Sequence, residues 1–117
     1  MASEHPIGGM LMHKTVAAAT TNATVVKASP GQVWEIIVNN VNAAVRYLKL
    51  YNKATAPTVG TDVPVLTLAI PAASVQQCRL WGADFTAGIS FATTTEATDV
   101  GATAISANES VINIGYT

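Results

Sequence analysis

Hydrophobic positions in this chain alternate with polar ones over short stretches, and Gly, Pro, Asn and Ser interrupt the pattern. A period of two is typical of half-buried β-strands, whereas an amphipathic helix needs a period of 3.6. No Ala-rich stretch combines the helical period with capping residues, so we predict no helix. The predicted strands span residues 23–28, 33–39, 44–51, 65–70, 74–81, 87–93 and 110–116.

The turn between the first two strands carries a specific prediction. At residues 29–32, Pro30 presets φ for the second position of a type II turn, and Gly31 would supply the positive φ of the third position. In the strand that follows, alternation places Trp34 on the same face as Ile36. We therefore interpret Trp34 as a core residue.

The strand at 44–51 is expected to have one buried face and one outer face. Leu48 and Leu50 lie two residues apart, so they share a face and form the expected core pair. The outer face of this strand would then carry the intervening side chains, Tyr47, Lys49 and Tyr51.

The strand at 74–81 has no clean apolar face. One face would carry Val75, Gln77, Arg79 and Trp81, and the other Ser74, Gln76, Cys78 and Leu80. A strand in the middle of a sheet normally buries at least one face, so this mixture indicates an edge strand or a contact between subunits.

Seven or eight short strands joined by turns favour an all-β fold, an antiparallel two-sheet sandwich of jelly-roll-like or Ig-like type. We assign residues 22–117 to this domain and residues 1–21 to an extended N-terminal arm. The arm is interpreted either as a disordered terminus or as a segment that docks on a neighbouring subunit. Its apolar island, Met10, Leu11 and Met12, would then be the contact.

Composition changes this picture because the chain has few charges. Charged residues make up 11% of it, against about 25% in a typical soluble domain, while half of its residues are hydrophobic. Six basic and seven acidic residues leave a net charge of -1, which argues against a nucleic-acid-binding surface. An uncharged surface protects poorly against association. The composition therefore indicates a surface that is covered by copies of the chain or by a larger partner.

Candidate catalytic and metal-binding residues are sparse. The single Cys78 excludes an internal disulfide framework and a Cys-rich zinc site, and His5 and His13 lack partners at ligand spacing. The chain contains neither a nucleophile elbow nor a glycine-rich phosphate loop. No signal peptide or membrane span is apparent. We predict a protein that is not an enzyme, needs no cofactor or metal, binds no membrane and is made in a cytoplasm.

Two stretches resemble a known family: RYLKLYNKATAPTVGTDVP at 46–64 and GISFATTT at 88–95. They are similar to small virion-associated proteins of tailed bacteriophages, and the resemblance extends over roughly residues 22–117. It implies a non-enzymatic structural β-sandwich, most similar to capsid decoration (cement) proteins. Such proteins commonly form homotrimers on the lattice of the major capsid protein, on the capsid exterior.

The resemblance leaves a second reading open, a tail, baseplate or fibre module that binds host glycans or adapts other virion proteins. It transfers no binding residues. The candidate partner-binding residues come instead from the arm and from the edge strand: Met10, Leu11, Met12, Arg79 and Trp81.

Overall fold

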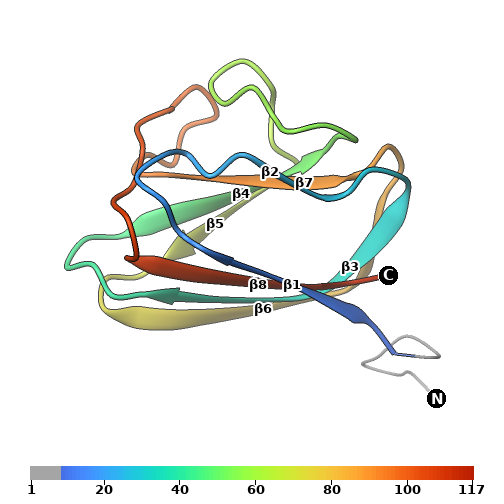
Figure 1. The fold of residues 1–117 in the computed structure, drawn as a ribbon, viewed down its shortest axis with the longest axis horizontal. Helices are drawn as coiled ribbons and strands as arrows, with labels where there is room; N and C mark the ends of the chain where they lie inside the picture. The colour runs from blue at the N-terminus through green and yellow to red at the C-terminus, as the bar shows by residue number, and fades with distance from the viewer. Residues whose placement is uncertain (1–8) are drawn as a thin grey trace.

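Eight β-strands form the regular structure of residues 9–117, the part of the chain that the computed structural model describes (Figure 1). They form two four-stranded sheets in which every neighbouring pair is antiparallel. The predicted two-sheet sandwich is therefore confirmed, and the described residues contain no helix. The strands are β1 (Leu11–Val16), β2 (Thr24–Lys27), β3 (Gly31–Asn40), β4 (Arg46–Asn52), β5 (Leu66–Ile70), β6 (Ser74–Phe85), β7 (Ile89–Thr94) and β8 (Ser110–Tyr116).

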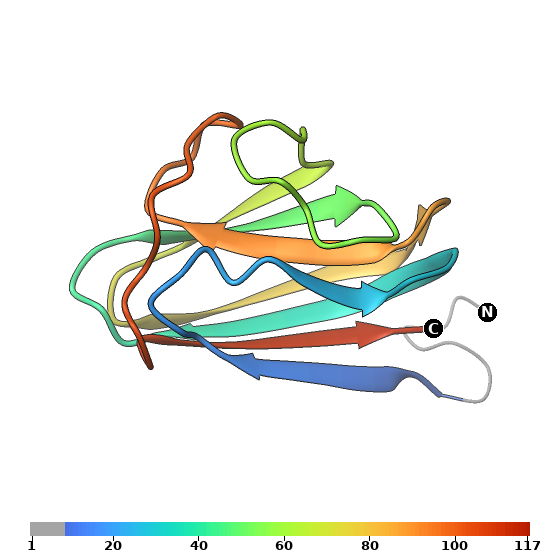
Figure 2. The same ribbon diagram turned by 45° about the horizontal axis from the view of Figure 1, so that its top comes forward.

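The order of the strands identifies the sandwich as a jelly roll. Sheet A has the order β1-β8-β3-β6 and sheet B has the order β2-β7-β4-β5. The two sheets form separate layers, and the chain passes from one to the other at every connection except that between β4 and β5 (Figure 2). The pairs β1–β8, β2–β7, β3–β6 and β4–β5 are therefore nested, as in a long hairpin wrapped into a sandwich. This arrangement selects the jelly roll over the Ig-like alternative.

The core lies between the two sheets and is almost wholly aliphatic. Leu48 and Leu50 are both buried in it, as alternation predicts. Inner-face side chains from the two layers meet in one cluster, as is usual for stacked sheets. Its fully buried members are Val33, Ile36, Val38, Leu48, Leu50, Ile70, Phe85, Ile89, Phe91, Ile112 and Ile114.

The outer face of β4 differs from the prediction. Lys49 and Tyr51 point away from the core, yet their exposed fractions are 0% and 1%. The long connections at 53–65 and 95–108 lie over sheet B and cover them (Figure 1). Strand alternation alone could not reveal this, because the covering residues come from other parts of the sequence.

The prediction for Gly31 is wrong in its mechanism. Gly31 does not have a positive φ, and it begins β3 rather than completing a type II turn. A Cβ atom here would lie 2.5 Å from the carbonyl oxygen of Thr117 and 2.9 Å from Cδ of Lys27. Glycine is required at this position for close approach of the backbone to its neighbours, not for turn geometry.

The N-terminal segment also differs from the predicted arm. Residues 11–16 form β1, which pairs with β8 over six positions and so belongs to the sandwich. The remainder of the predicted arm before Gly9 lies outside the described residues. Alternation in β1 is hard to recognise because both faces of this edge strand remain partly exposed.

Candidate interaction surface

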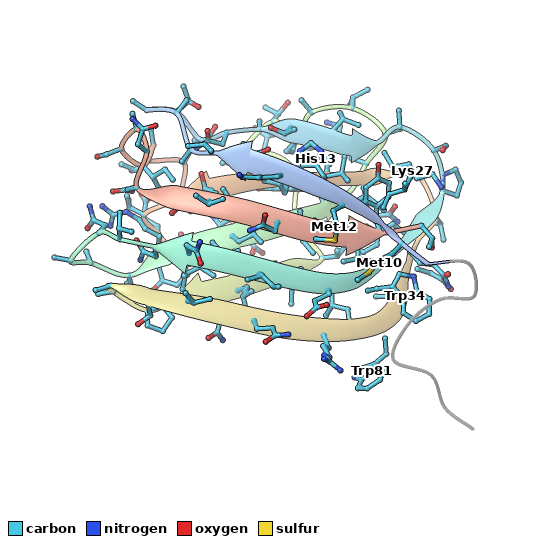
Figure 3. The ribbon with its side chains drawn as sticks, turned by 60° about the horizontal axis from the view of Figure 1, so that its bottom comes forward. Met10, Met12, His13, Lys27, Trp34 and Trp81 are labelled. Atoms are coloured by element: carbon cyan, nitrogen blue, oxygen red, sulfur yellow. The ribbon has the colours of Figure 1, made fainter. Side chains whose placement is uncertain are left out.

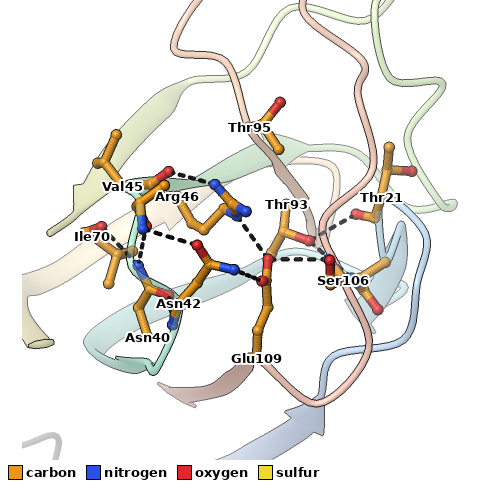
Figure 4. Close-up of polar contacts among 12 residues, drawn as sticks. Thr21, Asn40, Asn42, Val45, Arg46, Ile70, Thr93, Thr95, Ser106 and Glu109 are labelled. Atoms are coloured by element: carbon orange, nitrogen blue, oxygen red, sulfur yellow. Dashed lines mark hydrogen bonds and ion pairs between the residues drawn. The ribbon is translucent and has the colours of Figure 1, made fainter. Parts of the chain in front are cut away.

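One cluster of charged groups joins the beginning of β8 to β4. Glu109 accepts hydrogen bonds from Arg46 Nε at 2.7 Å, from Asn42 Nδ2 at 2.5 Å and from the backbone N–H of Ser106 at 3.0 Å (Figure 4). Burial raises the pKa of the Glu109 carboxyl, but these hydrogen bonds and the Arg46 charge outweigh it and hold the pKa below its usual value. This cluster satisfies its own members and fixes the fold.

A second cluster fixes the loop over sheet B. The Lys49 ammonium donates hydrogen bonds to the carbonyl oxygens of Thr98 at 2.6 Å and Gly101 at 3.0 Å. Burial lowers the pKa of Lys49, while the nearby carboxylates of Glu96 and Asp99 oppose that shift. The ammonium thus binds the inside of the loop much as a bound cation would, which again is a structural role.

The part of the chain that the structure describes shows neither a metal centre nor a membrane-spanning helix. Among residues 9–117, no group of three or more His, Cys, Asp or Glu side chains is placed to hold a metal ion. The same residues include no helix long and apolar enough to cross a membrane. The candidate partner-binding residues that the sequence predicts lie mostly on sheet A.

A bulge in β6 distorts one end of sheet A. Val33 pairs with Ala83 and Glu35 pairs with Arg79, so one residue of β3 faces three of β6. The residue of β3 is Trp34, and the three residues of β6 opposite it are Leu80, Trp81 and Gly82, two more than a regular ladder has. Bulges of this kind bend a strand and redirect its side chains.

Trp81 occupies a strained conformation in this bulge. Its φ is +54°, in the left-handed region that a bulky side chain adopts only at a cost. The indole projects away from β6 and is 58% exposed (Figure 3). The fold therefore holds a large aromatic side chain in water on a strained backbone.

Trp34 is not the core residue that alternation predicts. Trp34 has no partner on β8, because Val33 pairs with Tyr116 and Glu35 with the adjacent Gly115. The alternation of β3 is broken at this point, so Val33 and Ile36 are both buried while Trp34 is half-buried and lies outside the core cluster. Its indole covers Gly82, where a Cβ atom would lie 2.8 Å from Trp34 Cζ2. The indole N–H donates a hydrogen bond to Thr117 Oγ1 at 3.2 Å.

Met10 and Met12 cover the neighbouring part of the same end. A Cβ atom on Gly115 would lie 2.6 Å from Sδ of Met10 and 3.2 Å from Sδ of Met12. Figure 3, which looks onto sheet A from outside, shows both methionines and both tryptophans at this end. We call the surface formed by Met10, Met12, Trp34 and Trp81 the bulge patch.

The structure brings most of the predicted partner-binding residues together. Met10, Met12 and Trp81 lie in the bulge patch, and Arg79 lies in the row Met12–Gly115–Glu35–Arg79 across sheet A. Leu11 is separate, because strand alternation turns it to the opposite side of β1.

Sequence reasoning missed one member of the patch, Trp34, which it assigned to the core. It also missed the close approach of the patch side chains to two glycines, Gly82 and Gly115. A glycine inside a strand pattern signals a bulge or a close approach, and both apply here. The Trp81-Gly82 pair was thus the available signal.

The chemistry of the patch suits contact with another protein. Aromatic, Met and Arg side chains are enriched in interface cores, and exposed methionines adapt to irregular partners. Formal charges on the outer face of sheet A are balanced, with Lys14 and Arg79 against Glu35 and Asp84. The exposed large hydrophobic residues of this face are Met12, Val16, Val75 and Trp81.

Comparison with known proteins gives few matches. No family model and no curated protein matches the chain. Among solved structures, the coat protein of Tobacco streak virus is 10% identical, with a TM-score of 0.38 over 91% of this chain and 85% of the coat protein. A structure of the Tobacco streak virus coat protein dimer gives 9% identity and a TM-score of 0.36 over 91% and 84% of the two chains. A likeness at this level transfers neither a partner nor an assembly.

Proposed function

We propose that this chain is a non-enzymatic structural protein of a virion that associates with copies of itself and with the capsid through the bulge patch. The observation that carries the docking role is Trp81, exposed in water on a backbone with positive φ. Strain that persists in a fold is most often retained where it serves a function. A Trp side chain is also among the commonest residues to dominate the energy of an interface.

The virion setting is supported by two further points. The stretch at 46–64 resembles virion-associated proteins of tailed bacteriophages, and the jelly roll is a topology that capsid proteins use, together with lectins and cupins. We propose a capsid decoration protein, a homotrimer on the capsid exterior that contacts the major capsid protein. Many copies on one shell need only modest affinity each, because their contacts act together.

The test separates folding from association. Sedimentation velocity of the purified chain should show a trimer that Trp81→Ala disrupts, with an unchanged circular dichroism spectrum. Val63→Ala is the matched control, because Val63 is an exposed apolar residue in the 53–65 connection over sheet B. A wild-type chain that stays monomeric at high concentration would overturn self-association.

Location is tested by imaging the particle. Hundreds of copies over the shell would support decoration, whereas a few copies at one vertex would support a tail role. An exposed indole also stacks on sugars, so glycan binding lost on Trp81→Ala, with assembly intact, would favour the tail, baseplate or fibre module instead.

A further inference from the structure

Strand β1 is set apart from the other seven strands by its absence from the core. Each of β2 to β8 supplies at least one residue to the core cluster or to the partly buried hydrophobic residues packed against it, and β1 supplies none. Leu11, Met12 and Val16 remain half or more exposed. Burial of apolar surface, the main force that holds strands in a sandwich, therefore contributes little to the docking of β1.

Backbone hydrogen bonds hold β1 in place instead. The pairing with β8 runs from Leu11 opposite Tyr116 to Val16 opposite Val111. It continues at Ala17, whose N–H donates to the Ser110 carbonyl at 2.9 Å. These are main-chain contacts, so any chain carrying the same strand can make them.

Two side-chain contacts add to the backbone pairing. The methionines lie over Gly115, as described above, and the His13 ring meets Phe91 edge-on with centroids 5.9 Å apart. Both contacts involve residues of β1 or of its leading residue Met10, so they would be reproduced by the β1 strand of an identical chain.

The connection after β1 provides a pivot. Asn22, with φ of +55°, is fixed to sheet B because its Nδ2 donates to Thr93 Oγ1 at 2.9 Å. The carbonyl of Thr21 accepts a hydrogen bond from Thr93 N–H at 2.6 Å. Residues 18–20 form a short connection between the edge strand β1 and this fixed point on β7, and Ala18 is hydrogen-bonded within it to the Asn22 side chain. Short connections under strain favour the exchange of a segment between chains.

We propose that β1 exchanges between copies of this chain, so that β1 of one copy pairs with β8 of a second copy. The partner is an identical chain, and the exchanged pair keeps the register Val16 opposite Val111. Exchange links copies without new contacts, either reciprocally in a dimer or around a closed ring. The proposal goes beyond the proposed function, because it requires neither a virion nor Trp81.

Mixed cysteine variants test the exchange directly. Two chains are prepared in a Cys78→Ala background, one with Val16→Cys and the other with Val111→Cys. They are unfolded, refolded together and oxidised, and the covalent products are separated by mass. Exchange predicts a disulfide between the two different chains, Cys at position 16 to Cys at position 111, identified by peptide mapping.

Two controls make the result decisive. The single chain with both substitutions must form its internal disulfide, which shows that the geometry allows the bond. The pair Asn39→Cys and Val75→Cys reports β3–β6 pairing, where neither strand is terminal. The measured quantity is the yield of the disulfide between two different chains. A yield for positions 16 and 111 at least tenfold above that for positions 39 and 75 supports exchange, and equal yields overturn it. The Trp81→Ala variant should give the same yield, because Trp81 makes none of the exchanged contacts.

Discussion

The indole of Trp34 lies directly on Gly82, so close that a Cβ atom on Gly82 would lie 2.8 Å from Trp34 Cζ2. This contact joins β3 to the bulge of β6 and positions both tryptophans at one end of sheet A. Position 82 is therefore constrained in two ways. The indole leaves no space for a side chain, and the backbone has a φ of +80°.

Gly82→Ala should therefore destabilise the fold. The added methyl meets an aromatic ring and the backbone conformation becomes strained, so we expect a loss of about 2–4 kcal/mol in the free energy of unfolding. Urea denaturation followed by Trp fluorescence measures it. Gly9→Ala is the control: Gly9 also has positive φ, but nothing lies within 4 Å of its Cβ position. A loss no larger than that of Gly9→Ala would contradict the packing argument.

Trp81→Gly should separate stability from association. Glycine adopts positive φ without steric cost, so the free energy of unfolding should stay constant or rise by up to about 1 kcal/mol, while the trimer is lost. Trp81→Ala removes the indole but keeps the strain, so it should be the less stable of the two. Thermal melts of both variants, at a concentration where each is monomeric, provide the comparison. If Trp81→Gly were less stable than Trp81→Ala, the backbone at Trp81 would not be strained.

Tyr51→Phe should be tolerated. The Tyr51 hydroxyl is buried and, within residues 9–117, has no hydrogen-bond partner. Removal of an unsatisfied buried hydroxyl recovers its desolvation cost, so the free energy of unfolding should be unchanged or higher by about 1 kcal/mol. Tyr51→Ala, which also removes the ring, should cost about 3–5 kcal/mol. Guanidinium denaturation measures the free energy of unfolding of both variants. An equal loss for Tyr51→Phe and Tyr51→Ala would contradict the prediction.

Stability should fall in acid because of Glu109. The folded pKa of Glu109 lies below the usual value of a glutamate, so its contribution to stability is complete above that usual value and is lost as the pH falls through the folded pKa. Glu109→Gln should cost about 1.5–3 kcal/mol at pH 7, since hydrogen bonds to a charged group are lost, and less at pH 3.

The matched variant for this prediction is Arg46→Met, which removes the same ion pair from the other side. Both variants should show a smaller fall in stability between pH 5 and pH 3 than the wild-type chain. If the free energy of unfolding changed with pH by the same amount in all three proteins, other carboxylates would be responsible for the acid sensitivity.

The strands of the sandwich could be predicted from the sequence because their signal is local. Alternation identifies β3, β4, β5, β7 and β8 within a few residues. The order of the strands could not be predicted, because pairs such as Leu11 with Tyr116 join distant parts of the chain through main-chain groups that carry no sequence signal.

The candidate site could be predicted only in part, for a related reason. Met10, Met12 and Trp81 stand out in the sequence as apolar residues in regions without a clean core face, and the structure leaves Met12 and Trp81 exposed. Their common location depends on the β6 bulge and on the nested pairing. Trp34 is misassigned because the irregularity between Val33 and Glu35 breaks the alternation at this residue, and the prediction assumes an unbroken strand.

The nested pairing also orders the events of folding in time. The hairpin β4–β5 closes across a short connection, whereas β1 can find its place only after β8, the last strand of the sequence, has formed. Pairings between distant residues are slow, because the loss of chain entropy precedes the gain in contacts. During synthesis on neighbouring ribosomes, β1 is therefore the strand that stays unpaired for the longest time while other nascent chains are close.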